Sequence, residues 1–282
     1  MSPEPKRRRR LRVLLGVLLG VPLLAAVDGF VIEPRWLDVT THAITLPVRA
    51  PLVIAQISDL HTHDADGFIE GRVRAALDEL KPDLIVLTGD VYDSAEGKVA
   101  AAAFVDALQA PLGVWYAPGN WEHSVNNRLE AVDYLPSSTV GTLWNRATKL
   151  RDDLWLAGFD DQMAGTPKLD EGLKDVPDDV AVVGIFHSPA FFAEAQTRLD
   201  LALAGHTHGG QVRLPGLPPY WLPPSSGPYV EGFYGDDDSR LYVSRGIGMS
   251  MLPVRFFCRP ELAIFTVTPR QTTMTTTTTP PK

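Results

Sequence analysis

Residues 203–211 read Leu203-Ala204-Gly205-His206-Thr207-His208-Gly209-Gly210-Gln211, which places two histidines two positions apart, directly after a short apolar run. The flanking glycines allow the backbone to turn tightly at this point. A neutral imidazole is a common ligand for borderline metal ions. A lone His-x-His pair is a weak signal, because such pairs also occur on protein surfaces, so the rest of the chain has to decide its meaning.

Four further segments repeat the pattern of an apolar run that ends in Asp, Asn or His. They are Leu52–Ser58 before Asp59 and His61, Asp83–Thr88 before Asp90, Gly113–Pro118 before Asn120, and Val180–Phe186 before His187. Short, nearly continuous apolar runs are typical of buried strands that are covered on both faces. Ligands of open α/β sheets gather beyond the carboxyl ends of the strands, so we expect these polar residues to converge on one edge of a sheet.

The converging residues offer two carboxylates, one amide oxygen and four imidazoles. The expected metal ligands are Asp59, His61, Asp90, Asn120, His187, His206 and His208. Seven such ligands exceed the need of one four-coordinate zinc ion, and they suit two divalent ions (Mn, Fe or Zn) about 3.5–4 Å apart, with the two oxygens of Asp90 available to bridge them. Such a centre stays cationic, attracts a phosphate ester and lowers the pKa of bound water toward about 7. The alternative is that these residues cap strand ends or lie in the core as ordinary histidines.

These motifs resemble those of the calcineurin-like metallophosphoesterases. The matching stretches are Asp59-x-His61, Gly89-Asp90-x-x-Asp93, Gly119-Asn120-x-Glu122, His187 and Gly205-His206-x-His208, within residues 45–268. Gly158–Asp161, Tyr242–Gly248 and Leu252–Phe257 resemble the membrane-associated bacterial subgroup of YkuE-type phosphoesterases. The resemblance implies an α/β fold, an α+β four-layer sandwich of two mixed β-sheets flanked by helices. It also implies that one ion takes Asp59, His61, Asp90 and His208, and that the other takes Asp90, Asn120, His187 and His206.

One position departs from the family pattern, whose third motif reads Gly-Asn-His. The resemblance implies that this histidine hydrogen-bonds the phosphate and protonates the leaving oxygen, whereas this chain has Trp121 there. An indole has one N–H donor and no titratable proton, so Trp121 is expected to position the substrate, and the loss of a general acid costs a factor of about 10²–10⁴.

Three interpretations of the departure stay open. His123 reaches the site by a local shift; or the substrate has a good leaving group, such as a pyrophosphate; or His123 is a solvated loop residue. The expected catalytic residues are therefore Asp90 and Asn120, with Trp121 and His123 as further candidates.

The sequence thus predicts a two-metal phosphoesterase that hydrolyses a phosphodiester or pyrophosphate bond, in a lipid-linked or nucleotide-linked substrate, by attack of a metal-bound hydroxide. The alternative is a non-catalytic metal-binding module in which Trp121 has replaced the acid and hydrolysis is lost. The chain has no Gly-x-Ser-x-Gly elbow, no glycine-rich loop followed by Lys-Ser or Lys-Thr, and no Gly-x-Gly-x-x-Gly after the first strand. Their absence argues against a serine esterase, an NTPase and a dinucleotide-binding protein.

The amino end combines a basic cluster with an apolar run, as targeting segments do. Lys6, Arg7–Arg10 and Arg12 precede Val13–Val27, which spans about 22 Å as a helix, short of the roughly 30 Å of a hydrocarbon core. The length favours a signal peptide, whereas the lack of a small-x-small cleavage site favours an uncleaved anchor. Because the basic flank stays cytoplasmic, we expect the protein at the bacterial cytoplasmic membrane with its catalytic domain on the extracytoplasmic side, or exported after cleavage.

The composition fits one α/β domain behind this segment. The net charge of −8 is unevenly distributed along the chain, since residues 1–12 carry a charge of +5 and the remainder carries −13. An acidic body argues against nucleic acid as a partner, so the expected partners are a phosphate-containing small molecule or lipid-linked phosphate and, through the N-terminal segment, the membrane. The single cysteine, Cys258, excludes an intrachain disulfide and is expected to be a small buried hydrophobic side chain.

The expected organisation has four parts, which are a basic and apolar segment at 1–27, a juxtamembrane linker at 28–41, the metallophosphoesterase domain at 42–268 and a threonine-rich disordered tail at 269–282. Further strands are expected at His42–Val48, Leu154–Ala157, Leu241–Ser244 and Leu262–Val267, and helices at Gly71–Leu80, Val99–Gln109 and Val125–Leu135.

The stretch Leu214–Tyr229 contains too many prolines for a central strand. It is expected to be an irregular loop. With Met249, Met251 and Leu252 it forms an apolar lip that admits an acyl chain or touches lipid, or else it packs on the protein's own surface.

Overall fold

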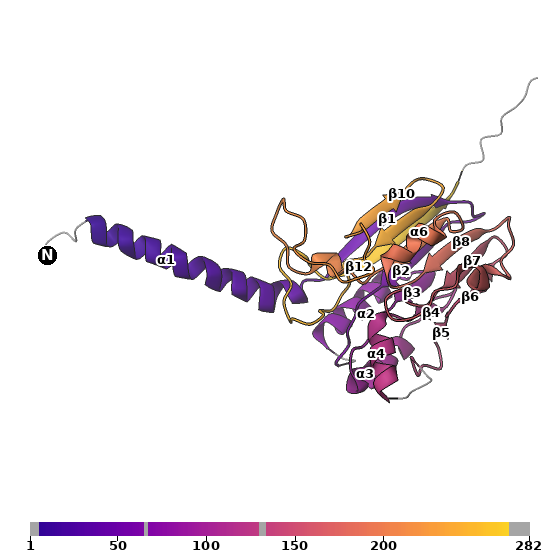
Figure 1. Cartoon of the computed structure of the whole chain (residues 1–282), viewed down its shortest axis with the longest axis horizontal. Helices are drawn as coiled ribbons and strands as arrows, with labels where there is room; N and C mark the ends of the chain where they lie inside the picture. The colour runs from indigo at the N-terminus through magenta and orange to yellow at the C-terminus, as the bar shows by residue number, and fades with distance from the viewer. Residues whose placement is uncertain (1–5, 65–66, 130–133, 271–282) are drawn as a thin grey trace, which may run out of the picture.

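The computed structural model describes residues 6–64, 67–129 and 134–270. Residues 1–5 of the basic segment and residues 271–282 of the expected disordered tail lie outside the described residues. Two six-stranded sheets pack face to face (Figure 1).

The first sheet is built around three parallel strands that carry the first three predicted apolar runs. Its order is β1-β12-β2-β3-β4-β5, with β12 antiparallel to β2 and the other neighbours parallel. The strands are β1 Asp38–Leu46, β2 Leu52–Ile57, β3 Leu84–Thr88, β4 Val114–Ala117, β5 Gly141–Thr142 and β12 Glu261–Pro269. Every residue of β3 is buried, as expected for a strand covered on both faces.

The second sheet has the order β10-β11-β9-β8-β7-β6. Its four inner strands run parallel, and the edge strands β6 and β10 are antiparallel to their neighbours. The strands are β6 Arg146–Arg151, β7 Leu154–Gly158, β8 Ala181–Ile185, β9 Leu201–Ala204, β10 Gly232–Gly235 and β11 Arg240–Val243. Both sheets are therefore mixed.

Three apolar clusters hold the layers together. Between the sheets, Ile54, Val86 and Phe265 of the first pack with Val183 and Leu203 of the second. The helices are α2 Phe68–Leu80, α3 Ala95–Asp106, α4 Asn120–Leu129, α5 Leu169–Leu173 and α6 Phe192–Ala195.

Helices close both outer faces of the sandwich. Val73 of α2 and Phe104 of α3 pack in a cluster with the outer face of the first sheet, and Leu169 of α5 and Phe192 of α6 do the same for the second. The expected four-layer sandwich of two mixed sheets flanked by helices is confirmed.

The main differences from the sequence prediction lie at element edges. The sequence does not predict strands β5, β6 and β10, because they are short or partly exposed edge strands without a continuous apolar run. Helix α4 begins at Asn120 rather than at Val125. The stretch 214–229 contains neither helix nor strand, as predicted.

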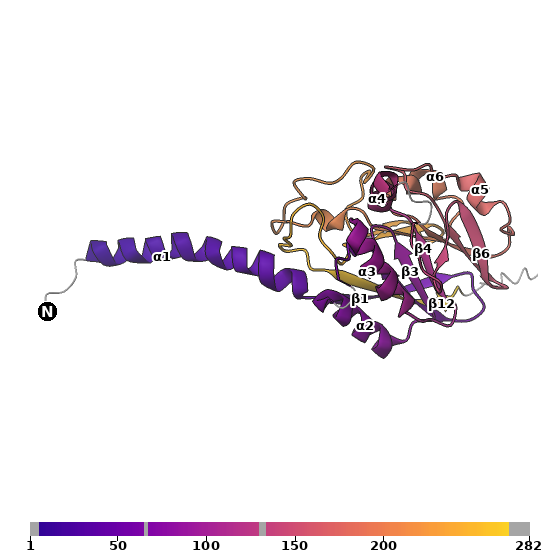
Figure 2. The ribbon, with the colours of Figure 1, turned by 90° about the horizontal axis from the view of Figure 1, so that it is seen from below.

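A long N-terminal helix projects from one end of the domain (Figures 1 and 2). Helix α1 (Lys6–Val27) continues into η1 (Asp28–Ile32) and η2 (Glu33–Arg35), and Arg8–Arg35 is long and apolar enough to cross a membrane. The sequence predicts a linker at 28–41, whereas the helical path reaches Arg35 and β1 begins at Asp38.

Contacts with a distant segment of the chain explain why residues 28–35 are helical and not an irregular linker. The backbone N–H of Arg255 donates to the Gly29 carbonyl at 2.9 Å. The buried Glu33 carboxylate accepts the backbone N–H groups of Phe257, at 2.8 Å, and of Cys258. No local sequence pattern predicts contacts between residues more than 200 positions apart.

Replacing Glu33 by alanine leaves the buried amide of Cys258 without its acceptor, which costs about 1–3 kcal/mol of stability. We therefore expect Glu33→Ala to lower the midpoint of thermal unfolding of the full chain in detergent. The exposed Glu79 provides the matched control, and Glu79→Ala should unfold like the wild type. Equal midpoints for the two variants would show that the Glu33 carboxylate does not fix this junction.

Candidate metal centre

The seven predicted ligands follow five strands, and the carboxyl ends of these strands meet at one edge of the sandwich. In strand order they are Asp59 and His61 (β2), Asp90 (β3), Asn120 (β4), His187 (β8), and His206 and His208 (β9). The first four come from the first sheet and the last three from the second. The six carboxylate and imidazole residues are buried.

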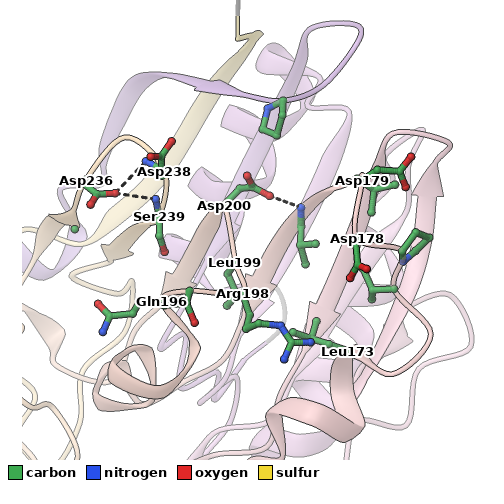
Figure 3. A pocket seen from close by; sticks show the side chains of 17 residues that line it. Leu173, Asp178, Asp179, Gln196, Arg198, Leu199, Asp200, Asp236, Asp238 and Ser239 are labelled. Carbon is green, nitrogen blue, oxygen red and sulfur yellow. Dashed lines mark hydrogen bonds between the residues drawn. The ribbon is translucent and has the colours of Figure 1, made fainter. Parts of the chain in front are cut away.

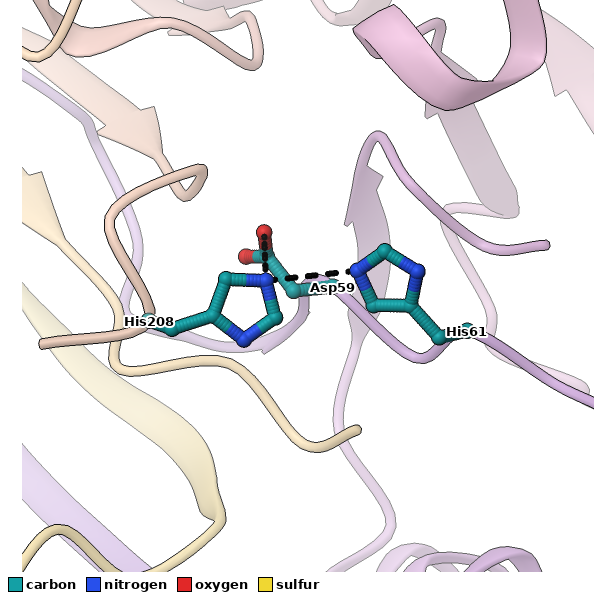
Figure 4. A group of neighbouring side chains, drawn as sticks. All are labelled: Asp59, His61 and His208. Carbon is teal, nitrogen blue, oxygen red and sulfur yellow. Dashed lines mark hydrogen bonds and ion pairs between the residues drawn. The ribbon is translucent and has the colours of Figure 1, made fainter. Parts of the chain in front are cut away.

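Asp59, His61 and His208 form the first group, and their side chains point toward one another (Figure 4). Nε2 of His208 lies 3.2 Å from Nε2 of His61 and 3.3 Å from Oδ1 of Asp59. One ligand atom from each residue lies within 4.8 Å of the others. Such spacing is what a single ion requires.

Asp90, His187 and His206 form the second group. Nε2 of His187 lies 3.1 Å from Oδ2 of Asp90 and 3.1 Å from Nδ1 of His206. The same Asp90 oxygen is 3.9 Å from Nε2 of His61, which belongs to the first group. Asp90 therefore lies between the two groups, where a bridging carboxylate would be.

Hydrogen bonds orient the rings of the second group. Nδ1 of His187 contacts the Thr88 carbonyl at 2.8 Å, and Nε2 of His206 contacts the Pro224 carbonyl at 2.6 Å. A ring nitrogen that donates to a carbonyl carries the proton, which leaves a lone pair on His187 Nε2 and on His206 Nδ1. When both rings are neutral, these two lone pairs face each other and repel, so the contact requires a proton or a metal cation between the nitrogens. Two nitrogens bound to one tetrahedral zinc ion lie about 3.4 Å apart, close to the 3.1 Å found here.

Asn120 adds an independent sign of a missing partner. Its Oδ1 atom is buried and has no hydrogen-bond partner among the described residues. The residue lines the same pocket as Asp90 and His206. Because a buried amide oxygen without a partner is costly, it fits the second ion as a ligand. The donor set as a whole therefore fits two divalent cations.

Five of the seven candidate ligands also share an unusual backbone conformation. The φ angles are 50° at Asp59, 45° at His61, 51° at Asp90, 75° at His206 and 50° at His208. A non-glycine residue in the left-handed region is uncommon, and such a position costs about 1–3 kcal/mol unless the surroundings hold it. The sharp turn lets each side chain project from the end of a buried strand into the site.

Electrostatics favour the protonation states that metal ligands need at three of the ligands. Burial, together with His61 and Arg255, holds the pKa of His208 well below its ordinary value. Burial and His187 also lower the pKa of His206. Burial acts to raise the pKa of Asp90, but its interactions with His187 outweigh this and keep it below the ordinary value. Neutral imidazoles and an ionised carboxylate are the forms that bind a cation. At His61 and His187 burial acts to lower the pKa, but the nearby carboxylates outweigh it and raise the pKa of both imidazoles.

Glu122 is not among the predicted site residues, yet it contacts the turns that carry two of them. Its carboxylate accepts the backbone N–H groups of Asp90 at 2.9 Å, Val91 at 2.5 Å and Gly119 at 2.8 Å. Burial and the nearby Asp90 raise the pKa of Glu122 to about 7. One side chain thus holds the turns after β3 and β4 together. The motif Gly119-Asn120-x-Glu122 contained the signal, but only the fold shows the role.

Asp93 was likewise not among the predicted site residues. Its Oδ2 atom lies 3.6 Å from Nδ1 of His61, and its Oδ1 atom lies 3.7 Å from Nδ1 of the exposed His63. Burial acts to lower the pKa of His61, but the Asp93 carboxylate helps to raise it, which makes this candidate ligand more basic.

Trp121 lies at the site itself. Its backbone N–H donates to Asp90 Oδ1 at 2.8 Å, and its ring stands edge-on to His61 with 6.0 Å between centroids. Its side chain lines two adjoining pockets, one with Asn120 and one with His61.

His123 lies elsewhere, in a buried polar cluster. Nε2 is 2.6 Å from Asp160 Oδ1, Nδ1 is 3.0 Å from the Tyr134 hydroxyl, and Trp144 packs edge-on at 5.5 Å. The interpretation of His123 as a solvated loop residue is therefore wrong, because the side chain is only 7 % exposed. Both ring nitrogens have partners away from the predicted ligands.

A pocket of about 860 Å³ opens beside the candidate ligands. Asp90, Asn120, His206 and His208 line its polar side. Its other walls are apolar and include Met163, Val212, Tyr220, Trp221, Pro223, Pro224, Met251 and Leu252. Met249 lines the adjoining pocket. The predicted apolar lip thus borders the site.

A second, acid-lined pocket of about 790 Å³ lies at the amino ends of strands in the second sheet (Figure 3). It includes Asp178 and Asp179 before β8, Asp200 before β9, and Asp236 and Asp238 between β10 and β11. The Asp200 carboxylate accepts the Val182 backbone N–H at 2.8 Å. This pocket lies at the end of the strands opposite to the ligand turns, so its residues serve as controls.

Comparison with known proteins identifies a family. A family model described as calcineurin-like phosphoesterase matches residues 52–210. The chain is 31% identical over 281 residues to the uncharacterized metallophosphoesterase YkuE of Bacillus subtilis, covering 93% of this chain and 97% of that protein. It is 29% identical over 246 residues to the phosphodiesterase YaeI of Escherichia coli, covering 82% and 88%. It is 27% identical over 273 residues to a transmembrane protein with a metallophosphoesterase domain from Danio rerio, covering 90% of this chain and 62% of that protein.

The geometry predicts two ions per chain after loading with manganese. Asp90→Asn removes the carboxylate between the two groups, so we expect the metal content to fall to one ion or fewer, measured by inductively coupled plasma mass spectrometry after gel filtration. Asp200→Asn, in the acid-lined pocket, should keep both ions. A full complement of metal in Asp90→Asn would contradict the bridging position.

Proposed function

We propose a hydrolytic function from one premise: this chain belongs to the calcineurin-like phosphoesterase family, a family of metal-dependent phosphoester hydrolases. The proposed reaction is the hydrolysis of a phosphodiester or pyrophosphate bond in a substrate that carries an apolar group. The observation that carries this proposal is the position of Asp90 between two groups of buried ligands, beside a pocket with apolar walls.

The ligand assignment follows from the two groups. Asp59, His61 and His208 would hold one ion, Asn120, His187 and His206 the other, and Asp90 both. When bound, manganese, iron or zinc ions supply a water molecule of lowered pKa and neutralise charge on the phosphate. Because the two carboxylates cancel only part of the charge of two divalent ions, the site retains attraction for a phosphate anion.

The protein's own residues would orient the substrate. Asn120 lines the pocket, and its amide N–H₂ can donate to a phosphate oxygen while its buried Oδ1 would serve as a ligand of the second ion. Trp121 offers an N–H and a flat ring from the same wall. Both come from the first turn of α4, whose position is fixed by the Trp121 backbone hydrogen bond to Asp90.

The leaving group would depart without help from an acid at the Trp121 position. His123 does not line the pocket, and its nitrogens are held by Asp160 and Tyr134. A leaving oxygen that needs little protonation, such as that of a pyrophosphate or an activated ester, suits this arrangement. The apolar walls favour a substrate with an alkyl or acyl chain.

The proposed location is the bacterial cytoplasmic membrane. The apolar stretch within Arg8–Arg35 would cross the bilayer, and the basic residues before it would stay on the cytoplasmic side. The domain would then face outward. The Danio rerio relative, named as a transmembrane protein, supports membrane association.

Turnover separates an enzyme from a non-catalytic metal-binding module. We expect the manganese-loaded full chain to hydrolyse bis-p-nitrophenyl phosphate, and Asp90→Asn to lose at least about 10²-fold in kcat/KM because charge stabilisation at the phosphate is lost. Release of p-nitrophenol is followed by absorbance, with Asp200→Asn as the control of unchanged rate. A metal-replete wild type without turnover would support the module instead.

Restoring an acid tests the interpretation of Trp121. Trp121→His should raise kcat/KM on phosphodiesters with poor leaving groups by about 10-fold or more, because a positioned acid assists poor leaving groups most. p-Nitrophenyl esters should change little. The measurement is the dependence of log kcat/KM on the pKa of the leaving alcohol, which should become shallower. His123→Gln should leave this slope as in the wild type; if it steepens the slope, His123 is the acid.

A further inference from the structure

The N-terminal helix is fixed to the rim of the pocket. Its last turns are tied to residues 254–258 by the Gly29 carbonyl and the Glu33 carboxylate. The packing at Gly29 is direct, since a Cβ there would lie 3.2 Å from Val254 Cγ2. The helix therefore leaves the domain at a set place and not on a flexible tether.

The chain just before residues 254–258 also forms part of the rim of the pocket. Met251 and Leu252 line the pocket a few residues before Arg255, and their exposed fractions are 81% and 63%. The rim loop after the metal-binding turn is joined to it, because the Gln211 side chain donates to the carbonyls of Ser250 at 3.1 Å and Leu252 at 3.0 Å. A backbone pair reinforces this junction, from Phe256 N–H to the Gln211 carbonyl at 3.0 Å.

Exposed apolar side chains gather on these three segments. Most of the exposed large hydrophobic side chains described outside α1 lie on the helix end, the loop after Gln211 or the segment 251–257. They are Phe30, Val31, Ile32, Trp36, Val212, Leu214, Leu217, Tyr220, Trp221, Met251, Leu252 and Phe257. Exposed apolar side chains that gather in one region of a protein surface mark an interaction site.

The views agree on the direction that this surface faces. In Figures 1 and 2 the loops that follow β9 and β11, in orange and yellow, project from the end of the domain at which α1 leaves. At the same end, the Arg259 guanidinium lies 4.8 Å from the centroid of the Trp36 ring. Tryptophan and arginine are common where a protein meets the headgroup layer of a membrane.

We infer that the helix end and the two rim loops form one surface that docks on the lipid bilayer, so that the pocket opens at the membrane and takes its substrate, an amphiphilic phosphoester, from the lipid layer. The occupant is lipid because the surface is continuous with the one helix in the described chain that is apolar enough to span a membrane. Anchoring makes the docking intramolecular, so weak apolar contacts suffice to hold the surface down. The substrate part of this inference rests on the proposed function.

Depth labelling tests the docking without any need for activity. The variants Leu214→Cys and Leu217→Cys of the full chain, each in phosphatidylcholine–phosphatidylglycerol nanodiscs, are labelled with an environment-sensitive nitrobenzoxadiazole dye; the native Cys258 is only 2% exposed and is shielded from the dye. We expect blue-shifted emission and quenching by spin-labelled lipid at both positions. A label at the exposed Asp178, beside the acid-lined pocket, should stay aqueous. Aqueous spectra at Leu214 and Leu217 would overturn the docking and point to a protein partner.

Kinetics test the substrate class. The double variant Leu214→Glu/Leu217→Glu should lose about 10-fold or more of kcat/KM on hexadecyl p-nitrophenyl phosphate in phosphatidylcholine vesicles, since two carboxylates resist burial in lipid. Turnover of the soluble ethyl p-nitrophenyl phosphate should stay within about 2-fold, because neither residue lines the pocket. Val99→Glu, an exposed change on α3, is the matched control.

Equal losses on both esters would overturn access from the membrane. If neither ester is hydrolysed by the wild type, the proposed function fails, whereas the labelling result still decides whether the surface docks.

Discussion

The site depends on sharp turns that most residues avoid. Five candidate ligands hold left-handed backbone conformations, and their strain must be offset by neighbours that fix each turn. Close packing supplies part of this, because a Cβ at Gly205 would clash with Ser58 Oγ and Asp59 Oδ2, and one at Gly119 would clash with Asp90 Oδ1. Glycine at these two places lets the turns of different strands lie in direct contact with the ligand carboxylates.

Each ligand group draws from both sheets. The first combines Asp59 and His61 of the first sheet with His208 of the second, and the second combines Asp90 of the first with His187 and His206 of the second. The apolar core between the sheets sets their separation, so it also sets the distances between ligand atoms. An ion bound by either group would in turn link the two sheets at their carboxyl edge, which couples metal binding to the packing of the sandwich.

The sequence predicts those features of the fold and site that depend on a single strand. Continuous apolar runs such as Leu84–Thr88 predict buried strands, and Asp90, two residues after the run, predicts a polar residue at the sheet edge. Features that depend on distant partners could not be predicted. The role of Glu122 requires the turns after β3 and β4 to be adjacent, and the helical path through Glu33 requires the segment at Cys258. Edge strands such as β6 lack the apolar run because one side faces solvent.

The behaviour of Trp121 and His123 follows from where α4 begins. The helix starts at Asn120, so each of the next residues is rotated by about 100° around its axis. Asn120 and Trp121 line the pocket, Glu122 turns back to the backbone after β3, and His123 reaches Asp160. His123 follows Trp121 by two positions, which corresponds to a rotation of about 200° around the helix axis. The two side chains therefore leave opposite sides of the helix. A histidine at 123 therefore cannot take the place of one at 121 without unwinding the turn that Glu122 holds.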